Sequence, residues 1–295
     1  MVATNRHKQT LQWKAKGFDF TLGHRTLIMG ILNVTPDSFS DGGLFFDPGR
    51  AIDKALEMDA EGADIIDVGG ESTRPGSESV PAQEEKRRVL SVIEGLTGRV
   101  KAAISIDTWK VEVATAALEA GASIVNDVTA LRGEVHMART IADREAGCVL
   151  MHMQGKPKSM QKNPHYDDLF GEITAFLRES VQAATDAGVP REAIVVDPGI
   201  GFGKTLEHNL RIIGGIDRFR ELGCPVMLGP SRKSMIGSIL GTEVTDRLEG
   251  TAAAVAAGAL LGADIVRVHD VREMSRVVRV ADAIREASDE QESGT

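Results

Sequence analysis

Short apolar segments recur along the chain at nearly regular intervals. Eight of them are rich in Val, Ile, Leu and Met, and they occupy residues 26–34, 63–70, 102–108, 123–128, 148–153, 193–199, 225–231 and 264–270. The segments between them repeat apolar residues with helical spacing, as in AIDKALEMDAEGA and VEVATAALEAGAS. Nearly continuous apolar runs of this length predict strands that are buried on both faces, and their alternation with helices predicts a parallel sheet.

The number and spacing of these units indicate how the sheet is arranged. From Leu27 to Ile265 each strand follows the previous one after about 34 residues on average. This spacing predicts an α/β fold, a (β/α)8 TIM barrel in a single domain. A doubly wound open sheet is the alternative, because the same alternation of elements would serve it. Eight units, and no G-x-G-x-x-G motif after the first strand, favour the closed barrel.

The same pattern divides the chain into three parts. We expect an N-terminal extension over residues 1–20, the barrel domain over residues 21–286 and a tail over residues 287–295. The tail sequence, ASDEQESGT, is polar throughout and predicts disorder. Within the domain, the Gly-Ala pairs of AEGAD, EAGAS and LLGAD predict the ends of helices.

Composition and charge exclude several partners. The 295-residue chain has a net charge of −9 and is 4% aromatic, so it offers neither a basic stripe nor a stacking surface for nucleic acid. The longest run of small apolar residues, 251–263, is too short and too rich in alanine to span a bilayer, and no secretion signal is visible. We therefore expect a cytoplasmic protein without a nucleic-acid or membrane partner. Cys148 and Cys224 each lead into an apolar run, which predicts two buried free thiols.

Polar residues follow almost every predicted strand. They are Asn33, Asp67 with Glu71, Asp107, Asn126 with Asp127, His152 with Gln154, Asp197, Ser231 to Lys233, and Arg267 with His269. The carboxyl ends of barrel strands meet at one mouth, where barrel enzymes place their catalytic residues. Helix capping or turn formation is the simpler explanation for Asp67 and Asp127. It does not explain arginine, lysine and histidine, which cap helices poorly, so the set predicts an active site.

The charges at this mouth fall into two groups. The basic group follows the last two strands and comprises Arg232, Lys233, Arg267 and His269. This quarter of a barrel commonly binds phosphate, which predicts an anionic, phosphorylated substrate. The second group offers hydrogen-bond acceptors and one amide, and comprises Asp107, Asn126 and Asp197. Such a set would bind a flat heterocycle rich in N–H groups, or would form ion pairs with the basic group. The two interpretations are compatible, because the ion pairs can exist in the empty enzyme.

Eight motifs at these strand ends resemble those of the dihydropteroate synthase family, the pterin-binding enzymes of folate biosynthesis that sulfonamides inhibit. In chain order they are ILNVTPDSFSDGG, DVGGESTRPG, SIDT, NDVTA, MHMQGKP, DPGIGFGK, GPSRKSMIG and VRVHDV, and the resemblance covers roughly Thr26 to Val271. The resemblance is specific because all eight agree in order and spacing. It implies that the chain joins 6-hydroxymethyl-7,8-dihydropterin diphosphate to 4-aminobenzoate and releases diphosphate, with Mg²⁺ as cofactor.

The resemblance also implies which residues bind the metal and close the site. Asn33 would hold Mg²⁺ and the diphosphate, since a hard cation accepts an amide oxygen together with phosphate oxygens and water. VTPDSFSDGG would be a mobile first loop that closes over substrate, supported by Asp41. ESTRPGSESVP would be a second loop that brings Thr73, Arg74 and Pro75 to the site.

The remaining roles that the resemblance implies divide between the two substrates. The residues expected to bind the pterin diphosphate are Thr73, Asp107, Asn126, Met151, Asp197, Phe202, Lys233 and Arg267. Those expected around 4-aminobenzoate are Phe39, Pro75, the stem of Lys233, and Ser234 at a helix start, where unpaired N–H groups favour a carboxylate. The set expected to act in catalysis is Asn33, Asp41, Arg74, Lys233, Arg267 and His269.

Charge suggests the course of the reaction. Mg²⁺, Arg74, Arg267 and His269 would neutralise the departing diphosphate, and an aromatic amine is already neutral at pH 7, so no general base is assigned. Two other functions remain open: a pterin methyltransferase of the corrinoid pathway, which binds no diphosphate, and a non-catalytic pterin-binding paralogue. The resemblance further implies a homodimer formed through outer helices.

Overall fold

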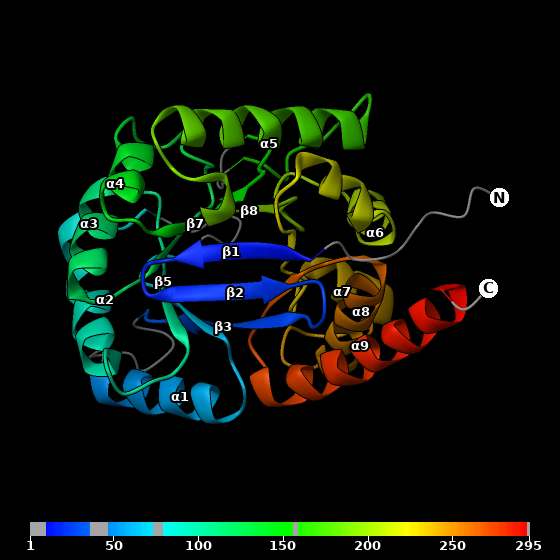
Figure 1. The fold of residues 1–295 in the computed structure, drawn as a ribbon, viewed down its shortest axis with the longest axis horizontal. Helices are drawn as coiled ribbons and strands as arrows, with labels where there is room; N and C mark the ends of the chain where they lie inside the picture. The colour runs from blue at the N-terminus through cyan, green and yellow to red at the C-terminus, as the bar shows by residue number, and fades with distance from the viewer. Residues whose placement is uncertain (1–9, 36–46, 73–78, 156–158, 294–295) are drawn as a thin grey trace.

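A computed structural model of the chain describes residues 10–35, 47–72, 79–155 and 159–293. Within these residues a ring of eight parallel strands forms the centre of the molecule (Figure 1). The strands are β3 (Leu27–Asn33), β4 (Ile65–Gly69), β5 (Ala103–Asp107), β6 (Ile124–Asp127), β7 (Gly147–Met151), β8 (Ile194–Asp197), β9 (Met227–Leu228) and β10 (Ile265–Val268). Their order is β8-β7-β6-β5-β4-β3-β10-β9, and a parallel bridge between Val196 and Val226 joins the two ends. The (β/α)8 barrel is therefore confirmed, and the open sheet is wrong.

Helices surround the ring on its outer face (Figure 1). They are α1 (Pro48–Ala60), α2 (Ala82–Leu96), α3 (Val111–Ala120), α4 (Met137–Asp143), α5 (Leu169–Asp186), α6 (Leu206–Gly214), α7 (Ser234–Leu240), α8 (Leu248–Leu261) and α9 (Val271–Ser293), with 3-10 turns η1 (Arg191–Ala193) and η2 (Ile216–Leu222). Gly62, Gly121 and Gly262 follow α1, α3 and α8 with φ of +101°, +124° and +120°. These are the Gly-Ala positions of the sequence, and glycine adopts this backbone region without a steric penalty. No helix in the described part of the chain is both long and apolar enough to cross a membrane.

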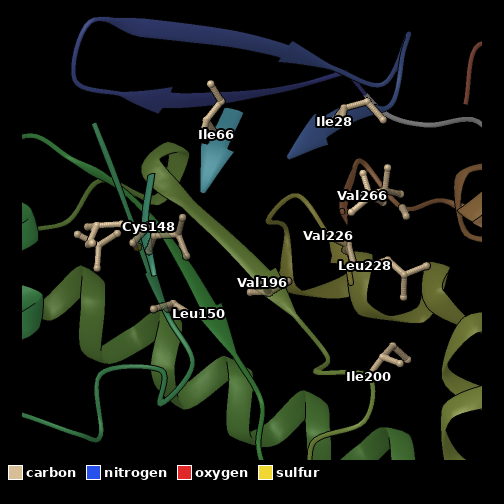
Figure 2. Packing of buried hydrophobic residues seen from close by; sticks show 14 of the residues in the cluster. Ile28, Ile66, Cys148, Leu150, Val196, Ile200, Val226, Leu228 and Val266 are labelled. Atoms are coloured by element: carbon tan, nitrogen blue, oxygen red, sulfur yellow. The ribbon is translucent and has the colours of Figure 1, made fainter. Parts of the chain in front are cut away.

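Alternate strand residues face two different cores. Outward-facing side chains such as Ile66, Cys148 and Val266 pack against the helices (Figure 2). Inward-facing residues at the amino-terminal end, such as Ile65 and Ile265, form a second cluster inside the ring. Because both faces are buried, the strands are apolar almost throughout. Cys148 and Cys224 are buried free thiols, as expected, and burial raises the pKa of the Cys148 thiol.

A β-hairpin closes the amino-terminal end of the ring. β1 (Leu11–Ala15) and β2 (Phe18–Leu22) pair antiparallel and lie across the barrel (Figure 1). Trp13 is fully buried in the inner cluster, and its indole N–H donates to the carbonyl of Ala193 at 3.1 Å. The boundary expected between residues 20 and 21 therefore falls inside β2. The described part of the supposed extension, from residue 10 on, packs into the barrel core because its alternate residues are apolar.

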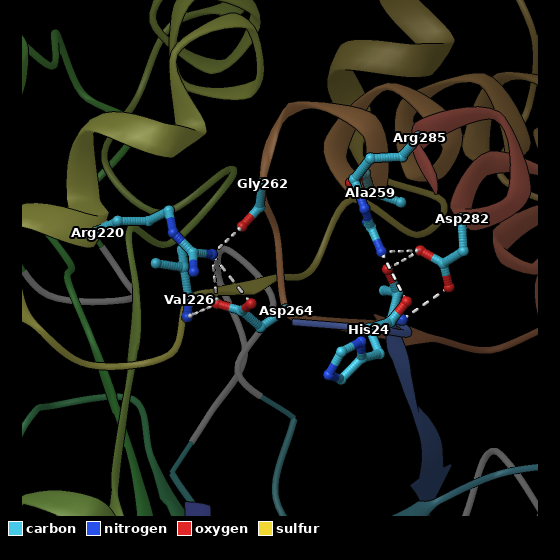
Figure 3. A network of polar contacts seen from close by, with 9 residues as sticks. His24, Arg220, Val226, Ala259, Gly262, Asp264, Asp282 and Arg285 are labelled. Atoms are coloured by element: carbon cyan, nitrogen blue, oxygen red, sulfur yellow. Dashed lines mark hydrogen bonds and ion pairs between the residues drawn. The ribbon is translucent and has the colours of Figure 1, made fainter. Parts of the chain in front are cut away.

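The end of the chain also differs from expectation. α9 continues to Ser293, so residues 287–293 are helical rather than disordered. Two buried polar residues attach α9 to the barrel: the Asp282 carboxylate accepts from the backbone N–H and the hydroxyl of Thr26, each at 2.8 Å, and Arg285 donates to the carbonyls of Ala259 and His24 (Figure 3). A helix held in this way can continue for further turns, since propagation is cheap once the helix is nucleated.

Replacing Trp13 by alanine should test the role of the hairpin. Trp13→Ala empties a fully buried site and leaves the Ala193 carbonyl without its donor, so we expect the free energy of unfolding to fall by about 3–5 kcal/mol. Urea denaturation followed by circular dichroism measures this loss. The neighbouring exposed variant Gln12→Ala should change it by less than about 0.5 kcal/mol. An equal, small effect of both variants would show that the barrel does not depend on the hairpin.

Candidate active site at the barrel mouth

Arg267 lies at the centre of a polar network inside the ring. Its Nε donates to Asp67 Oδ2 at 2.6 Å, and one terminal nitrogen donates to Asp107 Oδ2 at 2.7 Å. Asn126 donates to the same Asp67 oxygen at 2.9 Å. These residues come from β10, β4, β5 and β6, and all follow the inward-facing positions of the apolar cluster. The ion pairs expected between the basic and acidic groups are therefore present at Arg267.

The carboxyl groups in and beside this network are deeply buried. Burial raises the pKa of the Asp107 carboxyl to about 7; Arg267 opposes this rise, and the charge of Asp67 adds to it. Burial also raises the pKa of Asp197, against the opposing effects of a 2.7 Å hydrogen bond from the Gly199 N–H and of nearby lysines. Asp107 Oδ1 is buried and has no hydrogen-bond partner among the described residues. Buried carboxylates of this kind need donors, so the site is suited to a ligand rich in N–H groups.

A pocket lies between these carboxylates and an apolar wall. The described residues that line it are Asp107, Asn126, Val128, Met151, Asp197, Ile200, Phe202, Met227, Gly229, Lys233 and Arg267. Seven of the residues singled out in the sequence thus share one pocket. The Lys233 ammonium lies 4.2 Å from the centre of the Phe202 ring. Gly201, at φ +82°, permits this approach, because a Cβ there would come within 3.3 Å of the Lys233 side chain.

Lys204 contacts the backbone of the pocket residue Phe202 and was not predicted as a site residue. Its ammonium is 3.0 Å from the Phe202 carbonyl and 2.9 Å from His152 Nδ1, and it is almost fully buried. Burial lowers the pKa of Lys204 to about 7, although Asp197 opposes this effect. Burial, followed by the Lys204 charge, lowers the pKa of His152 to about 2. His152 is therefore neutral at pH 7, and it contacts the Lys204 side chain. The lysine in the DPGIGFGK motif is the sequence signal that could have indicated Lys204.

The ends of β9 and β10 form the basic side of the mouth. Ser231 Oγ accepts from the His269 N–H at 3.2 Å and lies 2.9 Å from His269 Nδ1. Arg232, which the sequence placed in the anion-binding group, instead forms an ion pair with Asp270, and its N–H donates to Thr251 Oγ1 at 3.1 Å. Of the basic residues, Lys233 and Arg267 are the ones that line the pocket within the described chain.

Asn33 lies at the mouth end of β3, opposite Gly69 of β4. A Cβ on Gly69 would lie 3.6 Å from Asp107 Cβ and 3.8 Å from Asn33 Oδ1, so glycine keeps the space between these side chains open. Throughout the described chain, no group of three or more His, Cys, Asp or Glu side chains could hold a metal ion. Ser234 is exposed at the start of α7. The other expected site residues, Phe39, Asp41, Thr73, Arg74 and Pro75, lie outside the described residues.

The two strand-end aspartates assigned to capping have different environments. Asp127 forms a local turn, since its carboxylate accepts from the N–H groups of Thr129 and Leu131 at 2.7 and 2.8 Å. Among the described residues Asp67 caps no helix, and its hydrogen bonds are with Arg267 and Asn126. The capping explanation is therefore confirmed for Asp127 and wrong for Asp67.

The raised pKa of Asp107 should appear in the pH dependence of stability. The folded protein keeps this proton up to about pH 7, whereas the pKa of an ordinary Asp is 3.8. The native state thus binds more protons in this range, so the wild type loses stability as pH rises through it. Asp107→Asn lacks the titrating group, and its free energy of unfolding relative to wild type should rise by about 1–4 kcal/mol between pH 4 and pH 8. Urea denaturation at each pH measures this difference, and a constant difference would contradict the assignment.

Known proteins share this sequence and fold. A family model described as pterin binding enzyme matches residues 29–269. The dihydropteroate synthase of Clostridium beijerinckii is 48% identical over 267 residues, which cover 90% of this chain and 97% of that protein. The structure of dihydropteroate synthase from Clostridium difficile in the presence of pteroic acid has a TM-score of 0.85 at 48% identity, covering 90% of this chain and 98% of that one. The structure of the Xanthomonas albilineans enzyme with 4-aminobenzoic acid has a TM-score of 0.87 at 42% identity, covering 94% and 99%. The chain belongs to the dihydropteroate synthase family of pterin-binding transferases.

Proposed function

We propose that the mouth pocket is where this chain joins 6-hydroxymethyl-7,8-dihydropterin diphosphate to 4-aminobenzoate and releases diphosphate. The buried acceptors of this pocket carry the assignment. Asp107 and Asp197 are acceptors with raised pKa values, and Asp107 Oδ1 lacks a partner among the described residues. A pterin presents a guanidine-like edge of N–H donors, which would satisfy both carboxylates.

The walls of the pocket suit the rest of the pterin. Met151 and Phe202 provide an apolar surface for a flat ring, and Asn126 adds an amide at one edge. The Arg267 guanidinium lies in the same pocket and would stack on the ring while facing the diphosphate. The Lys233 ammonium, which lies over the Phe202 ring, would also hydrogen-bond the pterin.

The positive side of the mouth would receive the diphosphate. Arg267 lies on β10 and His269 follows that strand, and we assign both to the departing anion, together with Arg74, which lies outside the described residues. Asp41, also outside them, we assign to supporting the cationic centre. Preorganised positive charge stabilises a leaving group as its negative charge develops. The aromatic amine needs no general base, since it is neutral at pH 7, and His152 is not among the described residues that line the pocket.

Asn33 is the residue that would hold Mg²⁺. The donor set at the mouth fits an ion that arrives with the diphosphate, because the described residues offer no group of three or more His, Cys, Asp or Glu that could hold a metal ion by itself, while Asn33 offers one amide oxygen. When bound, the ion would neutralise charge on the phosphate oxygens. Asn33 itself would orient the diphosphate relative to Arg267.

The second substrate would bind between the pocket and the loops. Lys233 lines the pocket and Ser234 follows it at the start of α7, whereas Phe39 and Pro75 lie outside the described residues. We propose that 4-aminobenzoate binds across these residues, with its amine facing the pterin methylene. The Xanthomonas albilineans structure contains 4-aminobenzoic acid, which supports a site for this ligand.

A diphosphate-release assay tests the function directly. Wild-type protein with both substrates and Mg²⁺ should release diphosphate and form dihydropteroate, whereas a pterin methyltransferase or a non-catalytic paralogue would not. Asp197→Asn should weaken pterin diphosphate binding by about 1–3 kcal/mol, the usual cost of an unpaired buried polar group, as measured by calorimetry. Asp186→Asn, an exposed carboxylate at the end of α5, is the matched control and should leave affinity unchanged. Equal affinities for wild type and Asp197→Asn would remove Asp197 from the site.

The outer helices carry an apolar surface that supports a homodimer. Its exposed side chains are Leu206 and Leu210 of α6, Ile239 and Leu240 of α7, and Val244 and Leu248 at the start of α8. Neighbouring exposed apolar residues commonly mark an interface between subunits. We propose that two copies associate through these helices and that the dimer is cytoplasmic.

Sedimentation velocity at micromolar concentration tests the dimer. Wild type should sediment as a dimer, and Ile239→Glu should shift it to a monomer by placing a charge in the interface. Val135→Glu is the matched control, because Val135 is the most exposed of the large apolar residues at 92% and lies outside this surface. A monomeric wild type, or a dimer that persists in Ile239→Glu, would contradict this arrangement.

A further inference from the structure

Asp67 occupies an unusual position behind the pocket. It is fully buried on β4, and among the described residues it does not line the pocket, whereas Asp107, Asn126 and Arg267 do. Its Oδ2 accepts from both Arg267 Nε and Asn126 Nδ2. One carboxylate oxygen thus holds two side chains that face the ligand.

The contact with Arg267 has a geometric consequence. A guanidinium is planar, so hydrogen bonds from two of its nitrogens fix the orientation of its plane. In this chain the two anchors are Asp67 at Nε and Asp107 at a terminal nitrogen. Asp107 lines the pocket, where a ligand can engage its carboxylate, whereas Asp67 does not line it among the described residues. Asp67 can therefore hold Arg267 both before and after a ligand binds.

The contact with Asn126 decides how its amide is turned. An ionised carboxylate only accepts hydrogen bonds, so the atom of Asn126 that faces Asp67 must be the Nδ2 donor. The amide oxygen is then directed away from Asp67. The polar group that Asn126 presents to the pocket is therefore set by Asp67, which is not among the described residues that line the pocket.

Stability alone does not account for a carboxylate at this position. Asp67 Oδ1 and Ser105 Oγ, which are opposite each other on β4 and β5, are buried without hydrogen-bond partners among the described residues. A buried ion pair is often no more stable than apolar side chains of the same volume, and an unpaired buried oxygen costs more. The inward positions one layer below, Ile65 and Ala103, show that this interior accepts apolar residues.

We propose that Asp67 is a positioning residue that fixes the plane of Arg267 and the orientation of the Asn126 amide for pterin binding. This inference rests on the proposed function of the pocket, since it requires that Arg267 and Asn126 contact the pterin. It predicts that removing the Asp67 charge weakens binding of the pterin substrate without a matching effect on the other substrate.

The test compares Asp67→Asn with Asp127→Asn. Both aspartates are fully buried on barrel strands, but Asp127 forms only a local turn, so it is the matched control. Calorimetry with 6-hydroxymethyl-7,8-dihydropterin diphosphate should show at least tenfold weaker binding to Asp67→Asn and less than threefold weaker binding to Asp127→Asn. KM for the pterin diphosphate should rise by a similar factor, while KM for 4-aminobenzoate should change less than threefold. Equal losses in both variants, or a loss below threefold in Asp67→Asn, would overturn the proposal.

A double variant keeps the test valid if Asp67→Asn is unstable. Asp67→Asn combined with Arg267→Gln removes both charges, so no unpaired charge remains buried. Because Asp67 acts largely through Arg267, the double variant should bind the pterin diphosphate within threefold of Arg267→Gln alone. Affinity losses that multiply would show that Asp67 acts independently and would overturn the proposal.

The outcomes separate the inference from the proposed function on which it rests. If wild type itself binds no pterin diphosphate, the proposed function fails together with the inference. Normal wild-type binding with an unaffected Asp67→Asn refutes the inference alone.

Discussion

The closed ring of parallel strands imposes the constraint on which the rest of the molecule depends. Successive residues of a strand point to opposite faces, so every second residue of every strand enters one shared interior. In β4 these residues are Ile65, Asp67 and Gly69, and they differ in kind because each belongs to a different layer. The lower layer is apolar and is closed by Trp13, whereas the upper layers are polar and open at the mouth. The same alternation thus produces the core and the site.

The cations at the mouth differ because their surroundings differ. Arg267 has two carboxylate partners that favour its charge, and a guanidinium stays protonated even when it is buried. Lys204 has a neutral imidazole and a carbonyl as its partners, so burial lowers its pKa to about 7. Arginine is therefore the residue that can hold a permanent positive charge between carboxylates, and lysine is the residue that supports a loop.

Much of this arrangement was predictable from the sequence, for a physical reason. Strands buried on both faces leave continuous apolar runs, and the residue that ends each run must lie at the mouth, which is why Asp107, Asn126, Asp197 and Arg267 could be placed. The hairpin was missed because two five-residue strands with alternating pattern give a weak signal. Asp67 was misjudged because capping and network formation look alike in sequence. Only the register of β4 with β5 and the approach of Arg267 distinguish them.

The distribution of charge explains why the site can be both buried and specific. Asp67, Asp107 and Asp197 are all within the ring, where burial raises the pKa of Asp107 and Asp197 although Arg267 and the nearby lysines oppose this rise. A ligand that brings N–H donors supplies what the interior lacks, whereas one without them would leave the carboxylates unpaired in a medium of low polarity. Discrimination of this kind does not require many contacts, since each missing donor leaves a buried acceptor unsatisfied. The buried carboxyl acceptors that lack donors thus make the site selective for a ligand with N–H groups.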